Sequence, residues 1–416
     1  MLFGSAKIEL KDLSDREKNA LLILCGKSRE LYNVCTAAIC REYESGGKVL
    51  GYQALKAAVN GSAAYRSMGG YYFQILLTAI ADFKKYLSTD IYILRKSDRT
   101  LQVKNLDKFT LPHPKQGLRN VEIKNPLIKD GKILLLASSD TPTLYLRLPE
   151  QYQAKSITRA IIRPMYHARY WELTIEYTVT EAAHRLDPNK ALGIDLGVTN
   201  YATCVSTDGD SFIIDGKRLK SILQGYCKYR AKLLRASGGS NDTKRLCSLS
   251  RKTHNLSLDY ARKSAAYIID YCIAHGIGKI ILGWGIHFQN QNSNLGQNNQ
   301  LYALMPFAKL KDILSFQCQK HGLTFVTVDE CYTSQASALD LDPMPQHVQL
   351  EKVTFSGRRV HRGLYMSGDG IKLNADQNGA LNILRKGNVI PPFLGRSDGR
   401  GFACPRRINP LDNSAK

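Results

Sequence analysis

Apolar residues near the start of the chain recur at the spacing of an amphipathic helix. Ser14 and Glu17 have the spacing of a capping box just ahead of this stripe, which marks a helix start. A second long apolar run covers Tyr71 to Leu87. The pattern therefore predicts a helical region over residues 12 to 92. The apolar positions of its first helix are Leu21, Leu24, Leu31 and Ala38.

From about residue 110 to 182 the pattern changes to short runs in which apolar and polar residues alternate. The runs read VEIKN, KILLLAS, TLYLRL and YWELTIEYTV, and Pro, Gly and Asp separate them. Such runs are typical of strands with one face in a core. We expect a small β-barrel or curled sheet here. A boundary is predicted near residues 183 to 190, where the polar run EAAHRLDPNK precedes an apolar strand.

The second half of the chain begins with three predicted strands, two of them within residues 191 to 213 and joined by a hairpin turn at Thr-Asp-Gly, 207 to 209. A basic helical region follows over 217 to 275, then the buried-type strand KIILG at 279 to 283, a helix over 303 to 320 and the strand LTFVTVDE at 323 to 330. Three antiparallel strands, then helix, strand, helix and strand are the order of an RNase H-like core. The predicted fold class is α+β and multidomain, with an RNase H-like α/β core.

Charge narrows the class of partner. The chain has 58 Lys and Arg against 36 Asp and Glu, a net charge of +22 at pH 7. Such an excess repels itself unless a polyanion neutralises it. The 22 tyrosines offer surfaces for base or sugar stacking, so we expect nucleic acid in preference to a merely soluble basic surface.

The predicted helical region 217 to 275 has many basic residues and few compensating acids, which favours phosphate binding over a solvated charged face. The candidate phosphate-binding residues are Lys217, Arg218, Lys220, Lys228, Arg230, Lys232, Arg235, Lys244, Arg245, Arg251, Lys252, Arg262 and Lys263.

The ten cysteines are scattered and form no C-x-x-C pair. Four-cysteine zinc sites need such pairs, so we expect reduced, buried thiols and no structural zinc. His254, His287 and His361 have no ligand spacing either. The first ten residues lack a long apolar core, and no stretch of about 18 apolar residues follows. Neither secretion nor membrane insertion is indicated, and we expect a cytoplasmic, nucleoid-associated protein of a prokaryote.

Asp195 is the first candidate for chemistry. It stands inside the apolar strand Ala-Leu-Gly-Ile-Asp-Leu-Gly, where a carboxylate is expensive to bury without a cation or a partner. Gly193 and Gly197 flank it and let a ligand or a backbone approach closely. A carboxylate that caps a turn or pairs with a lysine is the structural alternative. Sugar kinases and actin-like ATPases use similar glycine-flanked aspartates, so this pattern alone leaves the reaction open.

The C-terminal segment is more specific. It reads Ser-Gly-Arg-Arg-Val-His-Arg-Gly-Leu-Tyr at 356 to 365 and Asn-Ala-Asp-Gln-Asn-Gly-Ala-Leu-Asn-Ile at 374 to 383. The second motif resembles the third RuvC motif of the transposon-encoded TnpB proteins, which are similar to the compact type V CRISPR effectors. The first motif resembles one found in a zinc-free branch of that family. Tyr332-Thr333-Ser334 and the segment 294–300 fit the same pattern, and the resemblance spans about 190 to 386.

The resemblance implies that Asp376 is a metal ligand. An N-cap position on the helix through Ala380 to Leu384 is the structural alternative, and capping and ligation are compatible. Residues near this site in sequence order are candidates for holding the scissile strand. They are Tyr332, Thr333, Ser334, Arg358, Arg359 and Arg362.

One acid of the family pattern is missing. A glutamate ends the fourth strand of ordinary RuvC sites, but the equivalent residue in Ile-Ile-Leu-Gly-Trp, 280 to 284, is Gly283. A RuvC-type site holds two divalent ions on carboxylate oxygens, and two aspartates alone are a poor cage.

Glu330 is the candidate replacement. It ends the next parallel strand, whose carboxyl end lies at the same edge of the sheet, and its side chain is long enough to reach back. The zinc-free branch similarly has a glutamate ahead of its Tyr-Thr-Ser. We therefore assign Glu330 as a relocated third ligand, with Asp329 as the second candidate and a solvated strand end as the structural alternative.

The resemblance implies an RNA-guided DNA endonuclease in which Asp195, Glu330 and Asp376 bind two Mg²⁺ or Mn²⁺ ions, with a guide RNA and double-stranded DNA as partners. The family's domain order implies a first wedge strand over 1–11, a helical recognition module over 12–109, a β-barrel wedge module over 110–190 and a RuvC nuclease domain over 191–416 with its basic insertion at 217–275. Two alternatives remain open: a nuclease-inactive RNA-guided DNA-binding protein such as a repressor, and a guide-independent RuvC-type nuclease.

Overall fold

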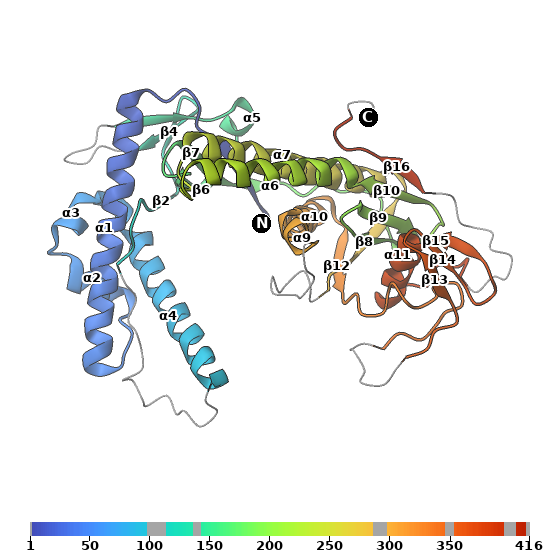
Figure 1. Ribbon diagram of the computed structural model, residues 1–416. Coiled ribbons are helices and arrows are strands. Elements are labelled where there is room, and N and C mark those ends of the chain that lie inside the picture. The colour runs from blue at the N-terminus through green and yellow to red at the C-terminus, as the bar shows by residue number, and fades with distance from the viewer. Residues whose placement is uncertain are drawn as a thin grey trace. The chain divides into compact units, whose positions relative to one another are not determined.

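The computed structural model describes residues 2–97, 114–135, 143–285, 298–345, 353–394 and 405–412. The chain divides into two compact units, Phe3–Val179 and Thr180–Lys416 (Figure 1). Both units combine helices and strands, so the predicted mixed α+β class is confirmed. His287, Cys404 and the first part of the predicted motif segment 294–300 lie outside the described residues.

The first unit contains the long helices that the apolar stripe predicts. α1 (Asp15–Gly46) begins at the capping box of Ser14 and Glu17 and ends at Gly47, whose φ is +63°. The short α2 (Tyr52–Val59), α3 (Ala63–Ser67) and the 3-10 turn η1 (Gly69–Tyr71) follow. α4 (Tyr72–Ser97) then runs past the predicted end at Leu87.

The strands of the first unit form two sheets. β1 (Leu2–Glu9), β7 (Tyr170–Val179), β6 (Ile157–Met165) and β2 (Val121–Lys124) form a sheet in that order. β3 (Ile128–Lys129), β4 (Lys132–Leu135) and β5 (Leu144–Arg147) form the second, and the short α5 (Glu150–Gln153) follows β5. Within the described ranges the strands form two sheets that share a core with α1 and α4, where we expected a small β-barrel or a curled sheet.

The second unit is built on a six-stranded sheet with the order β12-β11-β8-β9-β10-β16. β8 (Asp187–Leu196), β9 (Asn200–Ser206) and β10 (Ser211–Asp215) are antiparallel, whereas β11 (Ile277–Gly283) is parallel to β8 and β12 (Thr324–Val328) is parallel to β11. This is the strand order of an RNase H-like core and confirms the predicted order of elements. β16 (Arg406–Ile408), which pairs parallel with β10, was not predicted.

Helices cover both faces of this sheet because its central strands are apolar on both faces. Leu192 and Ile280 are buried in a cluster with α7 (Lys244–Ala274) and α10 (Phe307–His321). Ala191 and Ile281 are buried in a second cluster with α11 (Ala375–Lys386). α6 (Lys217–Ala236) pairs with α7, and α9 (Asn298–Leu304) precedes α10.

Three predicted boundaries in this unit are corrected. The helix expected over 303 to 320 is two helices, α9 and α10, because Pro306 interrupts it. The strand expected to end at Glu330 ends at Val328. Asp187 begins β8, so the predicted boundary near 183 to 190 partly overlaps a strand.

A small sheet of β13 (Arg358–His361), β14 (Leu364–Met366) and β15 (Lys372–Asn374) leads into α11. The cysteines that the structure describes are free thiols, and all but Cys227 and Cys331 are buried. None of the described helices has the length and apolar character needed to cross a membrane.

Candidate active site

Asp195 lies near the end of β8, where it pairs in register with Thr203 of β9. The glycines around it serve packing. A Cβ at Gly193 would lie 2.5 Å from the carbonyl oxygen of Ala380 in α11, and a Cβ at Gly197 would lie 2.8 Å from the carbonyl oxygen of Asn200. The expected close approach at these glycines is therefore made by the chain's own backbone.

α11 brings the second aspartate to the same place. A Cβ at Gly379 would lie 2.8 Å from Asp195 Oδ2, so the helix rests directly on that carboxylate. The N-cap of α11 is Asn374, whose side chain accepts hydrogen bonds from the amides of Asp376 and Gln377, and the expectation of an N-cap at Asp376 is wrong. Capping by Asn374 leaves the Asp376 carboxylate free for other contacts in the first turn.

Two polar side chains contact the Asp376 carboxylate. Asn200 Nδ2 donates to Asp376 Oδ2 at 2.6 Å, and Arg359 Nη2 lies 3.5 Å from Asp376 Oδ1. Arg407 Nη2 in turn donates to Asn200 Oδ1 at 2.9 Å. Asn200 is thus held from both sides and sets the position of the aspartate.

Glu330 lies two residues beyond β12, and its side chain covers Gly283. β11 and β12 pair in parallel with Gly283 opposite Val328. A Cβ at Gly283 would lie 2.7 Å from Glu330 Oε1 and 2.9 Å from Glu330 Cγ. The Glu330 carboxylate therefore occupies the space beside Gly283 at the end of β11.

The Tyr-Thr-Ser segment forms a turn directly after Glu330. Tyr332 has a φ of +63°, and the amide and hydroxyl of Thr333 donate to the carbonyl oxygen of Glu330 at 3.1 and 2.9 Å. Asn382 of α11 donates to the carbonyl oxygen of Thr333 at 2.9 Å. Thr333 is buried and its hydroxyl holds this turn, whereas Ser334 is exposed. The expectation that Tyr332, Thr333 and Ser334 hold the scissile strand stays a prediction.

The carboxyl groups influence one another. Burial raises the pKa of Asp195 well above its usual range, the charges of Glu330 and Asp376 act in the same direction, and Arg359 opposes them. Burial also raises the pKa of Glu330 to about 7, with Asp329 adding to the shift and Lys386 opposing it. Because Arg359 and Lys386 offset only part of the rise in pKa at Asp195 and Glu330, the electrostatics fit a bound cation.

The oxygen atoms of these carboxyl groups are the kind of ligand that a divalent ion prefers. Glu330 Oε1 is buried and accepts no hydrogen bond from the described residues, and carboxylate oxygens suit Mg²⁺ and Mn²⁺. In the part of the chain that the structure describes, however, no three His, Cys, Asp or Glu side chains are already grouped closely enough to hold an ion. The three carboxyl groups are neighbours and not a preformed cage, so binding an ion would have to draw them together.

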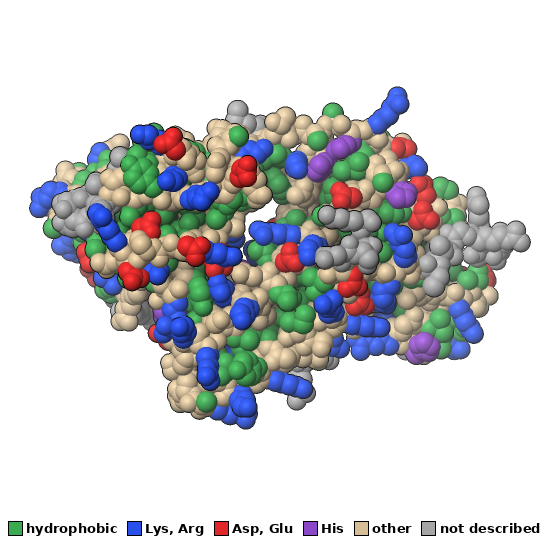
Figure 2. All heavy atoms as spheres, turned by 90° about the horizontal axis from the view of Figure 1, so that it is seen from above, with side chains coloured by type: hydrophobic (Ala, Val, Ile, Leu, Met, Phe, Trp, Pro, Cys, Tyr) green, Lys and Arg blue, Asp and Glu red, His purple; other side chains and the backbone are tan. Residues whose placement is uncertain are grey.

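Most of the predicted phosphate-binding residues lie on the surface of α6 and α7. Lys217, Lys228, Arg235 and Lys252 are exposed. Arg218 pairs with Asp412 at 3.1 Å, Arg230 donates to Asn241 Oδ1 at 3.0 Å, and Arg251 is partly buried. Arg358, Arg359 and Arg362 are exposed on and beside β13. Figure 2 shows Lys and Arg side chains spread over the face that it draws, with fewer Asp and Glu among them.

Sequence reasoning missed three residues around the carboxylates: Asn200, Lys386 and Arg407. Asn200 begins β9, directly after the turn that follows the Asp195 strand, and had a weak signal, because a polar side chain there lies at the same edge of the sheet. Lys386 Nζ is buried without a hydrogen-bond partner among the described residues and acts on Glu330 through its charge. Arg407 lies on β16, far away in sequence, and only the tertiary structure brings it to the site.

Two segments of the chain match models of known families. Residues 174–284 match OrfB_IS605, described as a probable transposase, and residues 307–383 match a TNB domain described as Cas12f1-like. The first segment contains β8 to β11 with Asp195. The second runs from α10 into α11 and contains Glu330 and Asp376.

Curated relatives lead in the same direction. The chain is 25% identical over 211 residues to the TnpB-like protein ORF457 of Acidianus two-tailed virus, covering 48% of this chain and 42% of that protein. It is 25% identical over 228 residues to the CRISPR-associated endodeoxyribonuclease Cas12f1 of Sulfoacidibacillus thermotolerans, covering 51% of this chain and 49% of that protein. The matched part spans less than half the length of each relative.

Among solved structures, the chain is similar to a Cas12f1–sgRNA–target DNA complex at 14% identity and a TM-score of 0.49, covering 88% of this chain and 82% of that chain. The family and sequence matches relate the chain to the TnpB/OrfB_IS605 proteins and to the Cas12f compact type V effectors. The match to a TNB domain gives no support to the predicted zinc-free branch. The expectation of no structural zinc therefore stays a prediction.

Proposed function

We propose that this chain is an RNA-guided DNA endonuclease that hydrolyses phosphodiester bonds at Asp195, Glu330 and Asp376. The observation that carries the proposal is the Glu330 carboxylate over Gly283, within electrostatic reach of Asp195 on an RNase H-like sheet. The similarity to a CRISPR-associated endodeoxyribonuclease supports DNA as the substrate. The net charge of +22 supports a nucleic-acid guide as well as a target.

Each residue has a distinct role in this proposal. Asp195, Glu330 and Asp376 would hold Mg²⁺ or Mn²⁺, which when bound supplies positive charge for phosphate oxygens and lowers the pKa of a water. Asn200 orients the Asp376 carboxylate through its 2.6 Å hydrogen bond. Arg359 is exposed beside Asp376 and is placed to contact a phosphate of the scissile strand.

The remaining surfaces follow from the same proposal. The exposed lysines and arginines of α6 and α7 bind phosphates of the guide and target duplex. In this proposal the first unit would contain the recognition and wedge modules, and the expected boundary between them, near residue 110, lies outside the described residues. These module assignments rest on the family resemblance.

The proposal is tested by removing one carboxylate at a time. Asp195→Ala or Asp376→Ala should abolish cleavage of guided DNA in Mg²⁺, while target binding in a gel-shift assay survives, because these residues hold metal and not nucleic acid. Asp208→Ala is the matched control, since Asp208 is a solvent-accessible acid of the same unit, paired with Lys190 at the β9–β10 turn. Full-rate cleavage by the Asp195 or Asp376 variant would place the active site elsewhere.

A nuclease-inactive RNA-guided DNA-binding protein is the second candidate. It is favoured by the lack, within the described ranges, of three metal-binding side chains that are already grouped. The same assay decides between the two. A parent chain that binds guided targets and never cuts in Mg²⁺ or Mn²⁺ is the inactive binder.

A further inference from the structure

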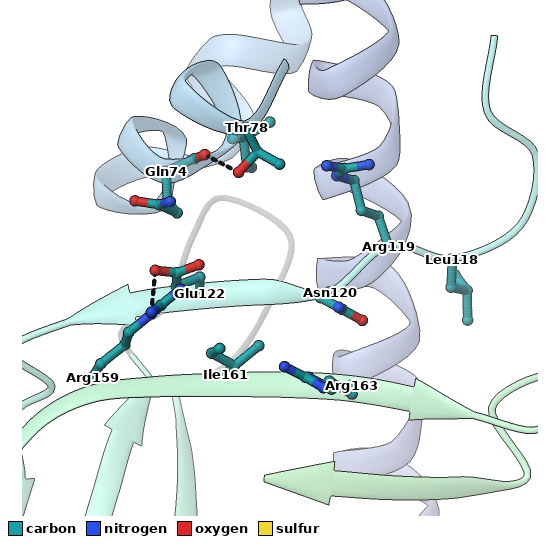
Figure 3. A pocket seen from close by; sticks show the side chains of 10 residues that line it. Gln74, Thr78, Leu118, Arg119, Asn120, Glu122, Arg159, Ile161 and Arg163 are labelled. Atoms are coloured by element: carbon teal, nitrogen blue, oxygen red, sulfur yellow. Dashed lines mark hydrogen bonds and ion pairs between the residues drawn. The ribbon is translucent and has the colours of Figure 1, made fainter. Parts of the chain in front are cut away.

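A second polar site lies in the first unit, away from the carboxylates. It is a pocket of about 360 Å³ between α4 and the strands β2 and β6 (Figure 3). Gln74 projects into it from α4, and Glu122, Arg159 and Arg163 line it from the two strands. The pocket is therefore a hollow with a helix on one side and a sheet face on the other.

Strand periodicity explains the charged lining. Along β6, Arg159, Ile161 and Arg163 alternate with Ala160 and Ile162. The first three line the pocket, whereas Ala160 and Ile162 are buried in the core of the unit. One face of β6 therefore packs in the core, and the opposite face presents two arginines, with an isoleucine between them, to the pocket.

The positive charge of the pocket is only partly paired. Arg159 Nε lies 2.5 Å from Glu122 Oε1, and Arg159 Nη1 lies 3.1 Å from Glu176 Oε1. Arg163 Nε, by contrast, is buried and has no hydrogen-bond partner among the described residues. Gln74 Oε1 is also buried without a described partner. Leaving such groups unpaired is costly, which points to a ligand that pairs with them.

Arg119, at the rim of the pocket, is fixed by its neighbours. Its guanidinium carbon lies 3.5 Å from the ring centre of Tyr32, and its Nη2 lies 3.4 Å from Asp82 Oδ2. Tyr32 donates its hydroxyl to the same oxygen of Asp82 at 2.9 Å. A guanidinium held in this way loses little side-chain entropy when it binds an anion.

The unpaired groups define the chemistry of the ligand. Arg163 needs an acceptor such as a phosphate oxygen, whereas Gln74 Oε1 needs an N–H or O–H donor. An apolar molecule satisfies neither group, and an inorganic phosphate leaves the apolar lining of Ile75 and Ile161 uncovered. A nucleotide carries phosphate oxygens, N–H groups at its base edge and flat apolar faces that suit Ile75 and Ile161.

The recessed position of these groups selects an unpaired base. Base edges in a duplex are read by side chains that protrude into a groove. Gln74 Oε1 and Arg163 Nε instead lie buried in the walls of a hollow. A base reaches them only after it has left its stack.

We propose that this pocket binds an unpaired nucleotide, with its phosphate on Arg119 and Arg163 and its base edge on Gln74. The inference rests on the proposed function in one respect, that a nucleic-acid strand is bound. The contact itself is separate from the nuclease site. RNA and DNA offer the same chemistry here, so the experiment includes both.

The test titrates the full chain with short single strands, about five nucleotides long, that carry the fluorescent base 2-aminopurine in ribose or deoxyribose form. Insertion of the base should give a saturable fluorescence change. The form that binds more tightly, ribose or deoxyribose, shows whether the pocket takes RNA or DNA. A nucleoside monophosphate should compete, and inorganic phosphate at equal ionic strength should not. Arg163→Gln should weaken binding about tenfold. Gln74→Ala should remove the preference for a base over an abasic site.

Arg41→Gln is the matched control, because Arg41 is an exposed arginine of α1 that does not line the pocket. Thermal unfolding of each variant checks that it folds. The competition by a nucleoside monophosphate is measured on the parent chain and so does not depend on the folding of any variant. Equal weakening by Arg41→Gln and Arg163→Gln, or equal binding of base-containing and abasic strands, would overturn the proposal. Asp195→Ala should keep this binding, so a failure of the nuclease proposal and a failure of the pocket proposal give different results.

Discussion

Gly283 is a glycine because the side chains of Ile383 and Glu330 fill the space beside it. A Cβ at 283 would lie 2.5 Å from Ile383 Cδ1 and 2.7 Å from Glu330 Oε1. Any side chain at 283 therefore competes with the one at 330. Adding a glutamate at 283 while residue 330 is still Glu or Gln would create a clash, since both have about the same length. The two positions have to be exchanged together.

Glu330→Gln should reduce cleavage strongly while guided target binding persists. The amide keeps the shape of the side chain but removes the negative charge that retains an ion. We expect a loss of at least about a hundredfold in the single-turnover rate, because even outer-sphere partners of metal ligands contribute about 10- to 100-fold. Substituting Mn²⁺ for Mg²⁺ should restore part of the rate.

The exchange variant and a neighbouring acid give the controls for Glu330. Gly283→Glu combined with Glu330→Gly moves the carboxylate to the end of β11, and recovery of activity above the Glu330→Gln level would support a shared ion position. Asp329→Asn should be mild, since Asp329 hydrogen-bonds the amide of Cys331 through Oδ1. If Asp329→Asn abolishes cleavage and Glu330→Gln does not, Asp329 is the ligand.

At the scale of elements, the connection between β12 and α11 is held together by carboxylates and amides. Asp342 Oδ2 accepts from the amides of Ser337 and Ser356 at 2.7 and 3.1 Å. Asp340 Oδ2 accepts from the Ser356 hydroxyl at 2.9 Å and from the Gly368 amide at 2.7 Å. This network joins two loops that follow Glu330 and precede Asp376. It therefore helps to set the distance between the two carboxylates.

Asp340 should make the stability of the chain depend on pH. Burial alone would raise its pKa, but hydrogen bonds from Ser337, Gly368 and Ser356 outweigh burial and hold the pKa below its usual range. A carboxyl group with a lowered folded pKa stabilises the fold above its unfolded pKa of about 3.9, and that contribution is lost as pH falls through the folded pKa. Asp340→Asn should therefore lower the free energy of unfolding at pH 7, and the difference from the parent should shrink below about pH 4.

Urea unfolding of the parent and of Asp340→Asn at pH 7 and pH 3 measures this difference. Asp369→Asn is the control, since Asp369 is exposed in the turn between β14 and β15, next to Gly368. A gap between parent and Asp340→Asn that is as large at pH 3 as at pH 7 would mean that the charge of Asp340 does not stabilise the network.

Elements with a strong local pattern could be predicted from the sequence. The capping box of α1 and the apolar strands β8 and β11 are determined by nearby residues, and they form where the pattern places them. The end of β12 at Val328 lies two residues before the predicted one. The cap at Asn374 was missed although it is local, since its side chain accepts from the amides of Asp376 and Gln377. Arg407 beside Asn200 depends on the added strand β16, which has only three residues and no strong signal.

In the candidate site, too, the sequence predicts local features and misses those that depend on tertiary contacts. The position of Glu330 near Gly283 follows from the rule that parallel strands end at one edge of a sheet, which needs only the order of elements. The pocket under α4 had no signal, because Gln74 and Arg163 come from a helix and a strand that meet only in the folded unit. The pairing of Asp376 with Arg359 depends on a hairpin whose exposed strand β13 has no apolar alternation.

At the scale of the whole molecule, the excess of positive charge sets how binding responds to salt. A protein that neutralises phosphates releases their counterions, so the logarithm of the affinity falls linearly with the logarithm of salt concentration. Lys228 and Arg235 are exposed on α6. Replacing both with glutamine should remove two phosphate contacts and reduce the steepness of the salt dependence by roughly 1.5, since each contact contributes about 0.7 to 0.9. Fluorescence anisotropy of a labelled guide strand over a salt series measures this slope.

The control for the salt series removes the same charge from another surface. Arg41 and Lys48 are exposed in the first unit, and neither is a candidate phosphate contact. If binding depends on specific phosphate contacts along α6, the double glutamine variant at 41 and 48 keeps the parent slope and the variant at 228 and 235 does not. If both variants reduce the slope equally, the net charge of +22 acts as a diffuse field and α6 is not a distinct phosphate-binding surface. Because the slope counts released ions, it separates these two cases even when both variants lower the affinity by the same factor at a single salt concentration.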